Sequence, residues 1–256
     1  MRDISPGIRI LKGTTDILVV APHGPRIKGR YENDIRTGVV VEEIHHRFGC
    51  TAIVNDRFFK PKGPVKKDAK RFNLDLYRID HSRKVPGYID AIDAVVSSPG
   101  KTFVLWVHGI SDQFALARGR EHAKIGRFEG PPEALHALIA YGQGGDPKTG
   151  DPDDRFTARA ETVERFRDLL KTGGMTAIPT HRECDNYRGR DAKRFNQWFL
   201  KQGYGFDRVE SIQLETKESG FRDTRSNAVK TALIIEAALR GLLTGESGSS
   251  EKESSI

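Results

Sequence analysis

The chain has 256 residues, of which 37% are hydrophobic and 30% are charged, and its 26 glycines and 12 prolines recur without a fixed period. This composition excludes collagen, coiled coils and wholesale disorder, and the length allows a sizeable hydrophobic core. Lysine and arginine outnumber aspartate and glutamate by 42 to 35, so the formal net charge of +7 favours anionic partners. The positive charge is spread along the chain, which does not favour nucleic acid.

No run of about 18 uncharged apolar residues is present, and the first twelve residues lack the apolar core of a signal peptide. We therefore expect a cytoplasmic protein with no membrane partner. The two cysteines, Cys50 and Cys184, are too few for a disulfide framework and lack the paired spacing of a thiolate metal site. Any metal ion must then be held by histidine and carboxylate side chains.

Apolar periodicity predicts alternating strands and helices along most of the chain. In chain order these are a strand over 16–21, a helix over 33–48, a strand over 51–55, a helix over 88–96, a strand over 102–107, a weaker strand over 134–141, a helix over 155–170, a weaker strand over 175–179, a strand over 209–215 and a helix over 222–243. Such alternation predicts an α/β domain whose mostly parallel sheet is covered on both faces.

We expect one catalytic domain over residues 1–244, followed by a disordered tail over 245–256 that is rich in Ser, Gly, Glu and Lys. The segment 57–74 is long, basic and punctuated by proline and glycine. Such segments are uncommon in compact domains unless they bind something, so we interpret it as functional.

Three polar side chains come at or just after the ends of predicted strands. His23 and His108 are each followed by glycine, and Glu215 ends the strand over 209–215. Ligands of open parallel sheets lie beyond the carboxyl ends of the strands, so these side chains are candidates for one site. Neutral imidazole is the commonest nitrogen ligand of Zn²⁺.

Two histidines need a third ligand. Glu32 precedes the first predicted helix and can return to the same edge of the sheet, and Asp34 competes for this role. Two histidines and a carboxylate with one open position form a hydrolytic zinc site. Glu215 would then act as the general base that activates water and passes the proton to the leaving nitrogen.

The ordered set of motifs resembles the N-formylglutamate amidohydrolase family over roughly residues 16–240. The motifs are VVAPHG at 19–24, the acidic Glu32 before a helix, RFNLDLYR at 71–78, VHG at 107–109 and SIQLE at 211–215. The resemblance implies a three-layer α/β/α fold of the phosphorylase/hydrolase-like type, shared with zinc carboxypeptidases and aspartoacylase-like deacylases. It also implies zinc bound by His23, Glu32 and His108, with Glu215 as the base.

The same resemblance implies where a substrate carboxylate binds. In the related deacylases an arginine of an Arg…Asp-Leu-Asn-Arg stretch binds this group, and the matching positions are Arg71, Asp75 and Arg78. Tyr77 stands where the family has asparagine, and Asn73 is the nearby amide that could replace it. Arg222, shortly after the Glu215 strand, is a further candidate for substrate contact, with a charged helix start as the alternative.

The sequence thus predicts a zinc-dependent amidohydrolase acting on a small, carboxylate-bearing, N-acylated amino acid such as N-formyl-L-glutamate. A zinc peptidase acting on a peptide or a γ-linked polyglutamate would use the same residues. A non-catalytic module that binds polyanions through the basic segment 57–74 is the alternative from another class. The oligomeric state has no signature in the sequence.

Overall fold

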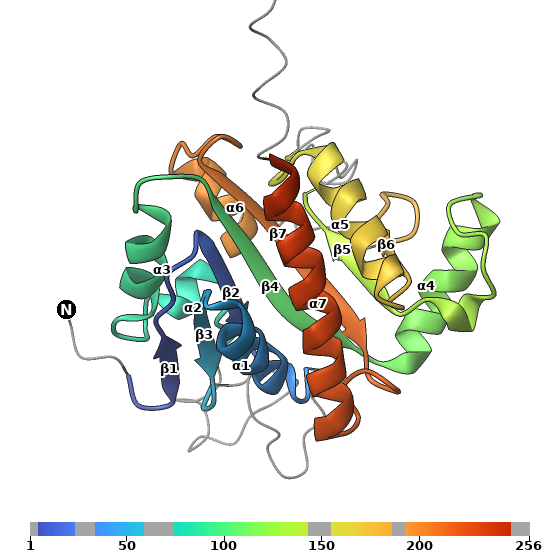
Figure 1. The fold of residues 1–256 in the computed structure, drawn as a ribbon, viewed down its shortest axis with the longest axis horizontal. Coiled ribbons are helices and arrows are strands. Elements are labelled where there is room, and N and C mark those ends of the chain that lie inside the picture. Colours follow the sequence, from blue (N-terminus) through green and yellow to red (C-terminus); the bar gives the residue numbers. More distant parts are fainter. Residues whose placement is uncertain (1–4, 24–33, 59–73, 143–154, 186–192, 247–256) are drawn as a thin grey trace, which may run out of the picture.

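The computed structural model describes residues 5–23, 34–58, 74–142, 155–185 and 193–246 (Figure 1). The elements in chain order are β1 (Ile8–Leu11), β2 (Ile17–Ala21), α1 (Thr37–Phe48), β3 (Thr51–Asn55), α2 (Ile79–Ser82), α3 (Tyr88–Val96), β4 (Thr102–Ile110), α4 (Asp112–Lys124), the 3₁₀ turn η2 (Pro132–Ala134), β5 (Ala137–Ala140), α5 (Ala160–Thr172), β6 (Ala177–Pro179), α6 (Phe195–Lys201), β7 (Val209–Lys217) and α7 (Arg225–Glu246). Among the described residues, no helix has the length and hydrophobicity needed to cross a membrane.

The strands form a seven-stranded sheet in the order β1-β3-β2-β4-β7-β5-β6. Neighbours from β3 to β7 are parallel, as are β5 and β6, whereas β1 pairs with β3 and β5 pairs with β7 in antiparallel fashion. The predicted α/β class with a mostly parallel sheet is therefore confirmed, with one antiparallel junction on each side of the central strands.

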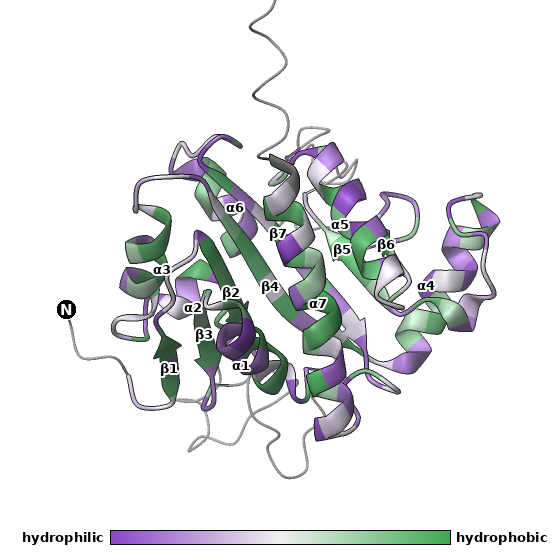
Figure 2. Ribbon diagram, viewed as in Figure 1, coloured by the Kyte–Doolittle hydropathy of each residue, from purple (hydrophilic) through white to green (hydrophobic). Residues whose placement is uncertain are grey.

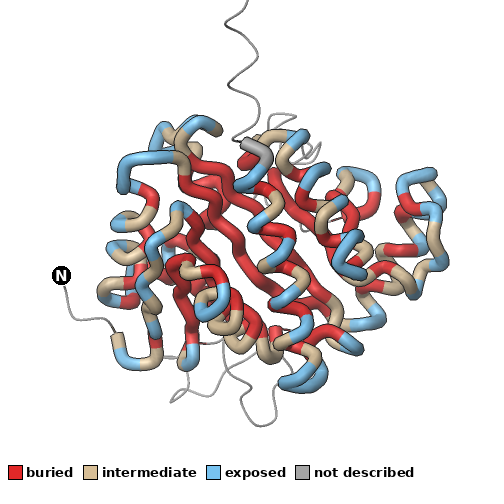
Figure 3. Tube along the Cα trace, in the orientation of Figure 1, coloured by how far each residue is buried: buried red, intermediate tan, exposed pale blue. Residues whose placement is uncertain are grey.

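Helices cover both faces of this sheet, so the domain has three layers. The strands are the most hydrophobic and most deeply buried part of the chain, while the helices carry polar residues on their outer sides (Figures 2 and 3). Helices α1, α5 and α7 pack on one face through Val41, Phe166 and Leu239. Helices α3 and α6 pack on the other face through residues such as Tyr88 and Phe195.

The structure extends several predicted elements and adds others. Strands β4 and β7 run to Ile110 and Lys217, past their predicted ends, because they pair with each other over all nine residues. Helix α1 begins at Thr37 rather than at residue 33, since Arg36 has a left-handed backbone with φ of 61°. Helix α7 ends at Glu246, two residues into the predicted tail, and residues 247–256 lie outside the described part of the chain.

Helix α5 begins at Ala160, five residues later than predicted. The preceding residues are not helical, since the N–H groups of Arg155 and Thr157 donate to the carbonyls of Gly142 and Tyr141 in another part of the chain. Strand β1 and helices α2, α4 and α6 were not predicted. The first is a four-residue edge strand, and α4 buries only Ala115, Gly119 and His122, so neither has a strong apolar pattern.

The sheet has its topological switch point between β2 and β4. From β2 the chain passes through α1 to β3 on one side, whereas β4 leads towards β7, β5 and β6 on the other side. The two strands are parallel neighbours, so their carboxyl ends meet where the strand order reverses. Open α/β sheets bind ligands in the crevice at such a point.

Candidate metal centre

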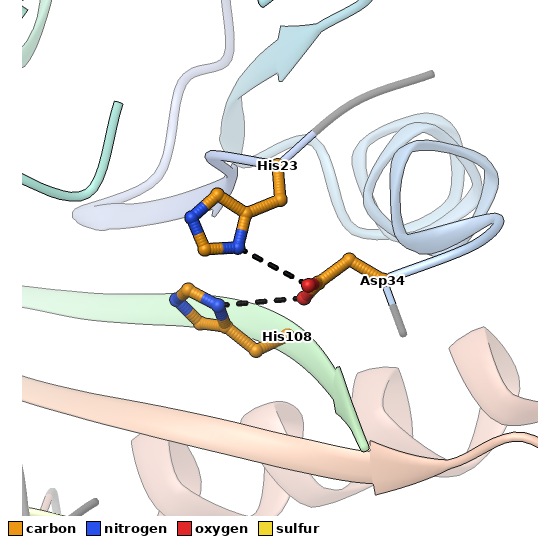
Figure 4. Close-up of side chains that lie close together, drawn as sticks. All are labelled: His23, Asp34 and His108. Carbon is orange, nitrogen blue, oxygen red and sulfur yellow. Dashed lines mark hydrogen bonds and ion pairs between the residues drawn. The ribbon is translucent and has the colours of Figure 1, made fainter. Parts of the chain in front are cut away.

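Two histidines and one aspartate meet at this switch point (Figure 4). His23 follows β2, His108 lies near the carboxyl end of β4, and Asp34 precedes α1. All three side chains are buried, although each is polar. The carboxylate points between the two rings, and one ligand atom from each residue lies within 4.8 Å of the others.

Both imidazoles present the same ring nitrogen to the carboxylate. Nδ1 of His23 lies 3.2 Å from Oδ2 of Asp34, and Nδ1 of His108 lies 3.4 Å from Oδ1. The ring centroids are 4.7 Å apart and the rings are nearly perpendicular, at 76°. Two nitrogen donors and one carboxylate are the ligand set of a hydrolytic zinc site, so these residues fit a zinc ion.

The loop that carries Asp34 is tied to both histidine segments. The N–H of Gly109 donates to Oδ1 of Asp34 at 2.7 Å. The hydroxyl of Thr37 lies 3.0 Å from the carbonyl oxygen of Asp34 and 3.3 Å from that of His23. These contacts hold the carboxylate against β4 and hold the loop against the end of β2.

A second carboxylate contacts the far side of the His23 ring. Oδ1 of Asp75 lies 2.9 Å from Nε2 of His23, and Oδ2 accepts from the guanidinium of Arg194 at 2.6 Å. A histidine that binds a metal usually donates its other ring N–H to a carboxylate, which fixes the tautomer and the ring orientation. Asp75 is placed to do this for His23.

Electrostatics favour charged forms in this buried group. Burial alone would lower the pKa of His23, but the carboxylates of Asp34 and Asp75 outweigh it and raise the pKa to about 10. Burial would likewise raise the pKa of Asp34, yet the rings of His23 and His108 hold it well below its usual value. These shifts favour a protonated His23 imidazole between two carboxylates in the metal-free group, and a divalent cation would take the place of the Nδ1 proton.

Glu215 lies beside this group on the next strand. Its partner in the β4–β7 register is His108, so both side chains project from the same face of the sheet. Glu215 is 7% exposed, and Gln213, two residues earlier on the same face, donates its amide N–H to Oε1. The predicted neighbourhood of His23, His108 and Glu215 is thus present, and the role of Glu215 as a base remains a prediction.

Solved structures with the same fold include an amidohydrolase. The N-formylglutamate amidohydrolase from Ralstonia eutropha JMP134 matches with a TM-score of 0.54 and 11% identity over 94% of this chain and 99% of that one. The gene product Atu2144 from Agrobacterium tumefaciens matches with a TM-score of 0.55 and 12% identity over 94% and 96% of the two chains. No family model and no curated protein matches the sequence. At these identities the likeness shows a shared α/β fold.

Several predicted site residues fall outside the described part of the chain. These are Glu32, Arg71 and Asn73, together with most of the basic segment 57–74. Glu32 as a ligand therefore stays a prediction, whereas its competitor Asp34 contacts both histidines.

The remaining predicted substrate contacts have partners within the protein. Asp75 is 2% exposed and contacts His23 and Arg194 as described. The guanidinium of Arg78 forms a two-pronged pair with Asp80, at 3.0 and 2.8 Å. Arg222 is fully buried, and its guanidinium donates to the main-chain carbonyls of Ile35, Ile110 and Thr216. Substrate contact by these residues stays a prediction.

Two residues near the centre were not expected there. Arg194 precedes α6, and its guanidinium stacks 5.6 Å from the ring of Tyr77 as well as pairing with Asp75. Tyr77 packs edge-on against His108 with ring centroids 4.7 Å apart. No local sequence pattern distinguishes Arg194 from the other arginines, whereas Tyr77 was visible as a departure from the family motif.

Proposed function

We propose that this chain is a zinc-dependent amidohydrolase that cleaves the amide bond of a small N-acylated acidic amino acid such as N-formyl-L-glutamate. The observation that carries the proposal is the buried group of His23, Asp34 and His108 at the switch point, with Glu215 in register beside it. The fold shared with an N-formylglutamate amidohydrolase supports an amide as the substrate.

His23, Asp34 and His108 would hold the zinc ion through two ring nitrogens and a carboxylate. When bound, zinc supplies a Lewis acid that polarises the amide carbonyl and lowers the pKa of a water molecule. Asp75 keeps the His23 ring oriented through its contact with Nε2. The burial of the centre removes competing water and strengthens the electrostatic interactions within it.

Glu215 would carry the proton. Its carboxylate accepts a proton from the attacking water and returns it to the amide nitrogen as the C–N bond breaks, so that one water yields an acid and an amine. The hydrogen bond from Gln213 fixes the orientation of the carboxylate on the strand. Proton transfer needs this orientation, because a general base must lie within hydrogen-bond reach of the proton that it takes.

Arginine side chains near the centre would hold the carboxylates of the substrate. Arg71 and Arg78 are proposed from the resemblance, and Arg194 is a third candidate, since its side chain is 19% exposed next to Asp75. Guanidinium groups bind carboxylates through two parallel hydrogen bonds, which suits an acidic substrate. The net charge of +7 acts in the same direction.

A substrate panel with the zinc-loaded protein tests the proposal. The panel contains N-formyl- and N-acetyl-L-glutamate, a neutral N-formyl amino acid amide, an unblocked dipeptide and a γ-linked diglutamate. We expect hydrolysis of the acidic N-acyl compounds, and none after His108→Ala. Cleavage of the peptides alone would instead assign a zinc peptidase. A protein that binds zinc but cleaves nothing would contradict the proposal and favour the anion-binding module.

A further inference from the structure

Arg222 is a buried cation whose hydrogen bonds connect three segments of the domain. Its side chain is fully buried, which is rare for arginine. Nη1 donates to the carbonyl of Ile35 at 2.6 Å, Nη2 lies 3.3 Å from the carbonyl of Ile110, and both Nε and Nη2 donate to the carbonyl of Thr216. The planar fork of a guanidinium can serve acceptors in these different directions at once, which a lysine cannot.

Each of these carbonyls belongs to a residue within two positions of a candidate site residue. Ile35 follows Asp34, Thr216 follows Glu215, and Ile110 comes two residues after His108. One side chain therefore connects the loop of the carboxylate ligand, the strand of the histidine ligand and the strand of the proposed base.

Arg36 makes the reciprocal bond. Its Nη1 donates to the main-chain carbonyl of Arg222 at 2.9 Å, while the Arg222 side chain donates to Ile35, the neighbour of Arg36. Among the described residues, Arg36 is the one non-glycine residue with positive φ, at 61°. Such a backbone is unfavourable for a side chain of this kind, so surrounding contacts must hold it. The two arginines thus lock the 34–36 loop to the segment that follows β7.

We propose that Arg36 and Arg222 are positioning residues for the metal centre, which set the place of Asp34 relative to His108 and Glu215. This inference rests on the proposed function, because it assumes that the three-residue group binds zinc. The buried guanidinium favours this role for Arg222 over the substrate contact that the sequence suggested. The nearby carboxylates of Asp34, Glu218 and Glu215 offset part of the cost of burying the charge.

The test measures zinc affinity in folded variants. Asparagine tolerates left-handed backbone, so Arg36→Asn removes the bond to the Arg222 carbonyl without changing the loop conformation. We expect the dissociation constant for zinc to rise about 10- to 100-fold, as for other contacts that orient a ligand. Arg36→Lys keeps a cation that can donate to the same carbonyl and should restore affinity to within about threefold.

Arg208 provides a matched control. Like Arg222 it donates to several main-chain carbonyls, those of Val96, Ser98 and Gly100, but it lies just before the amino-terminal end of β7, whereas the metal group lies at the carboxyl ends of the strands. Arg208→Met and Arg222→Met should both lower the melting temperature of the metal-free protein. Only Arg222→Met should also lower the affinity for zinc and alter the visible spectrum of bound Co²⁺, which reports coordination geometry.

The outcomes separate the two proposals. Unchanged zinc affinity and an unchanged Co²⁺ spectrum in folded Arg36→Asn would overturn the positioning role while leaving the metal centre intact. If Arg222→Met does not fold, the zinc affinities of Arg36→Asn and Arg36→Lys test the positioning role by themselves. Wild-type protein that binds no zinc would overturn the proposed function and this inference together.

Discussion

Glu215 and Glu210 lie on the same strand but project from opposite faces of the sheet. Glu215 shares its face with His108, whereas Glu210 accepts the N–H of Arg159 at the start of α5 and pairs with Lys101. The strand thus presents one carboxylate on the face of the candidate metal centre, and the other contacts the start of α5.

Substitution of each glutamate by glutamine tests whether Glu215 is the general base, with Glu210 as the control. Glu215→Gln should keep zinc and lose kcat by about 10²- to 10⁴-fold, because the amide cannot accept the proton. Glu210→Gln should lower stability and leave kcat within about threefold of the wild type. Steady-state kinetics gives kcat for both variants, with the zinc content of each sample quantified. Wild-type turnover by Glu215→Gln would eliminate Glu215 as the base.

The charge on His23 predicts how zinc binding depends on pH. In the metal-free protein its pKa is raised from 6.5 to about 10, so the ring carries a proton at neutral pH. Zinc must displace that proton, and affinity should therefore rise with pH, by about tenfold per unit, until the pKa is passed. Calorimetry of zinc binding at pH 7.5, in buffers of different protonation enthalpy, should show release of at least about one proton. Binding without proton release would refute the role of His23 as a protonated ligand that zinc deprotonates.

Residue patterns in the sequence indicate part of the candidate site. His23, His108 and Glu215 could be found because each stands at the end of an apolar run, and parallel strands bring such ends together. The choice between Glu32 and Asp34 could not be made, since it depends on how a loop folds back onto the Gly109 N–H. Arg194 reaches Asp75 across 119 residues of chain, and no local pattern encodes such a contact.

At the scale of elements, the layers were predictable and the ends of the strands were not. Apolar runs identify the buried strands of a covered sheet, but β4 extends through His108 to Ile110 and β7 extends past Glu215 to Lys217, because each strand supplies the other's hydrogen-bonding partners. The polar residues at their ends would predict a loop in an isolated segment. Pairing across the sheet overrides that local preference and places the site residues in register.

A buried hydrogen-bond chain joins α6 to the central strands beneath the site. The indole N–H of Trp106 in β4 donates to the hydroxyl of Ser211 in β7 at 3.0 Å, and that hydroxyl donates to Oδ1 of Asn196 in α6 at 2.7 Å. All three side chains are buried. The serine therefore serves as both acceptor and donor between three elements.

Removing that hydroxyl should destabilise the fold. Ser211→Ala leaves a buried indole N–H and a buried amide oxygen without this partner, at a cost of about 1–3 kcal/mol in the free energy of unfolding. Ser98→Ala removes an exposed hydroxyl that bonds only within its own helix end, and should stay within about 0.5 kcal/mol of the wild type. Urea denaturation compares the two, and equal stabilities would show that the buried chain contributes little.

At the scale of the whole molecule, the charge excess predicts salt-sensitive catalysis. A net charge of +7 attracts a substrate with two carboxylates, and salt screens this attraction over a Debye length of about 10 Å at 0.1 M. The value of kcat/KM for N-formyl-L-glutamate should therefore fall several-fold between about 20 and 500 mM salt. An uncharged N-formyl amino acid amide is the control, and an equal fall for both would argue against electrostatic attraction.

The metal centre brings these scales together, since it needs the sheet topology, the strand register and the three buried side chains at once. The zinc content of the purified wild type, Asp34→Ala and Glu32→Ala, measured by elemental analysis after incubation with zinc and desalting, tests it most directly. We predict about one zinc per chain in the wild type and in Glu32→Ala, and none in Asp34→Ala. Zinc retained by Asp34→Ala, or absent from the wild type, would contradict a centre built from His23, Asp34 and His108.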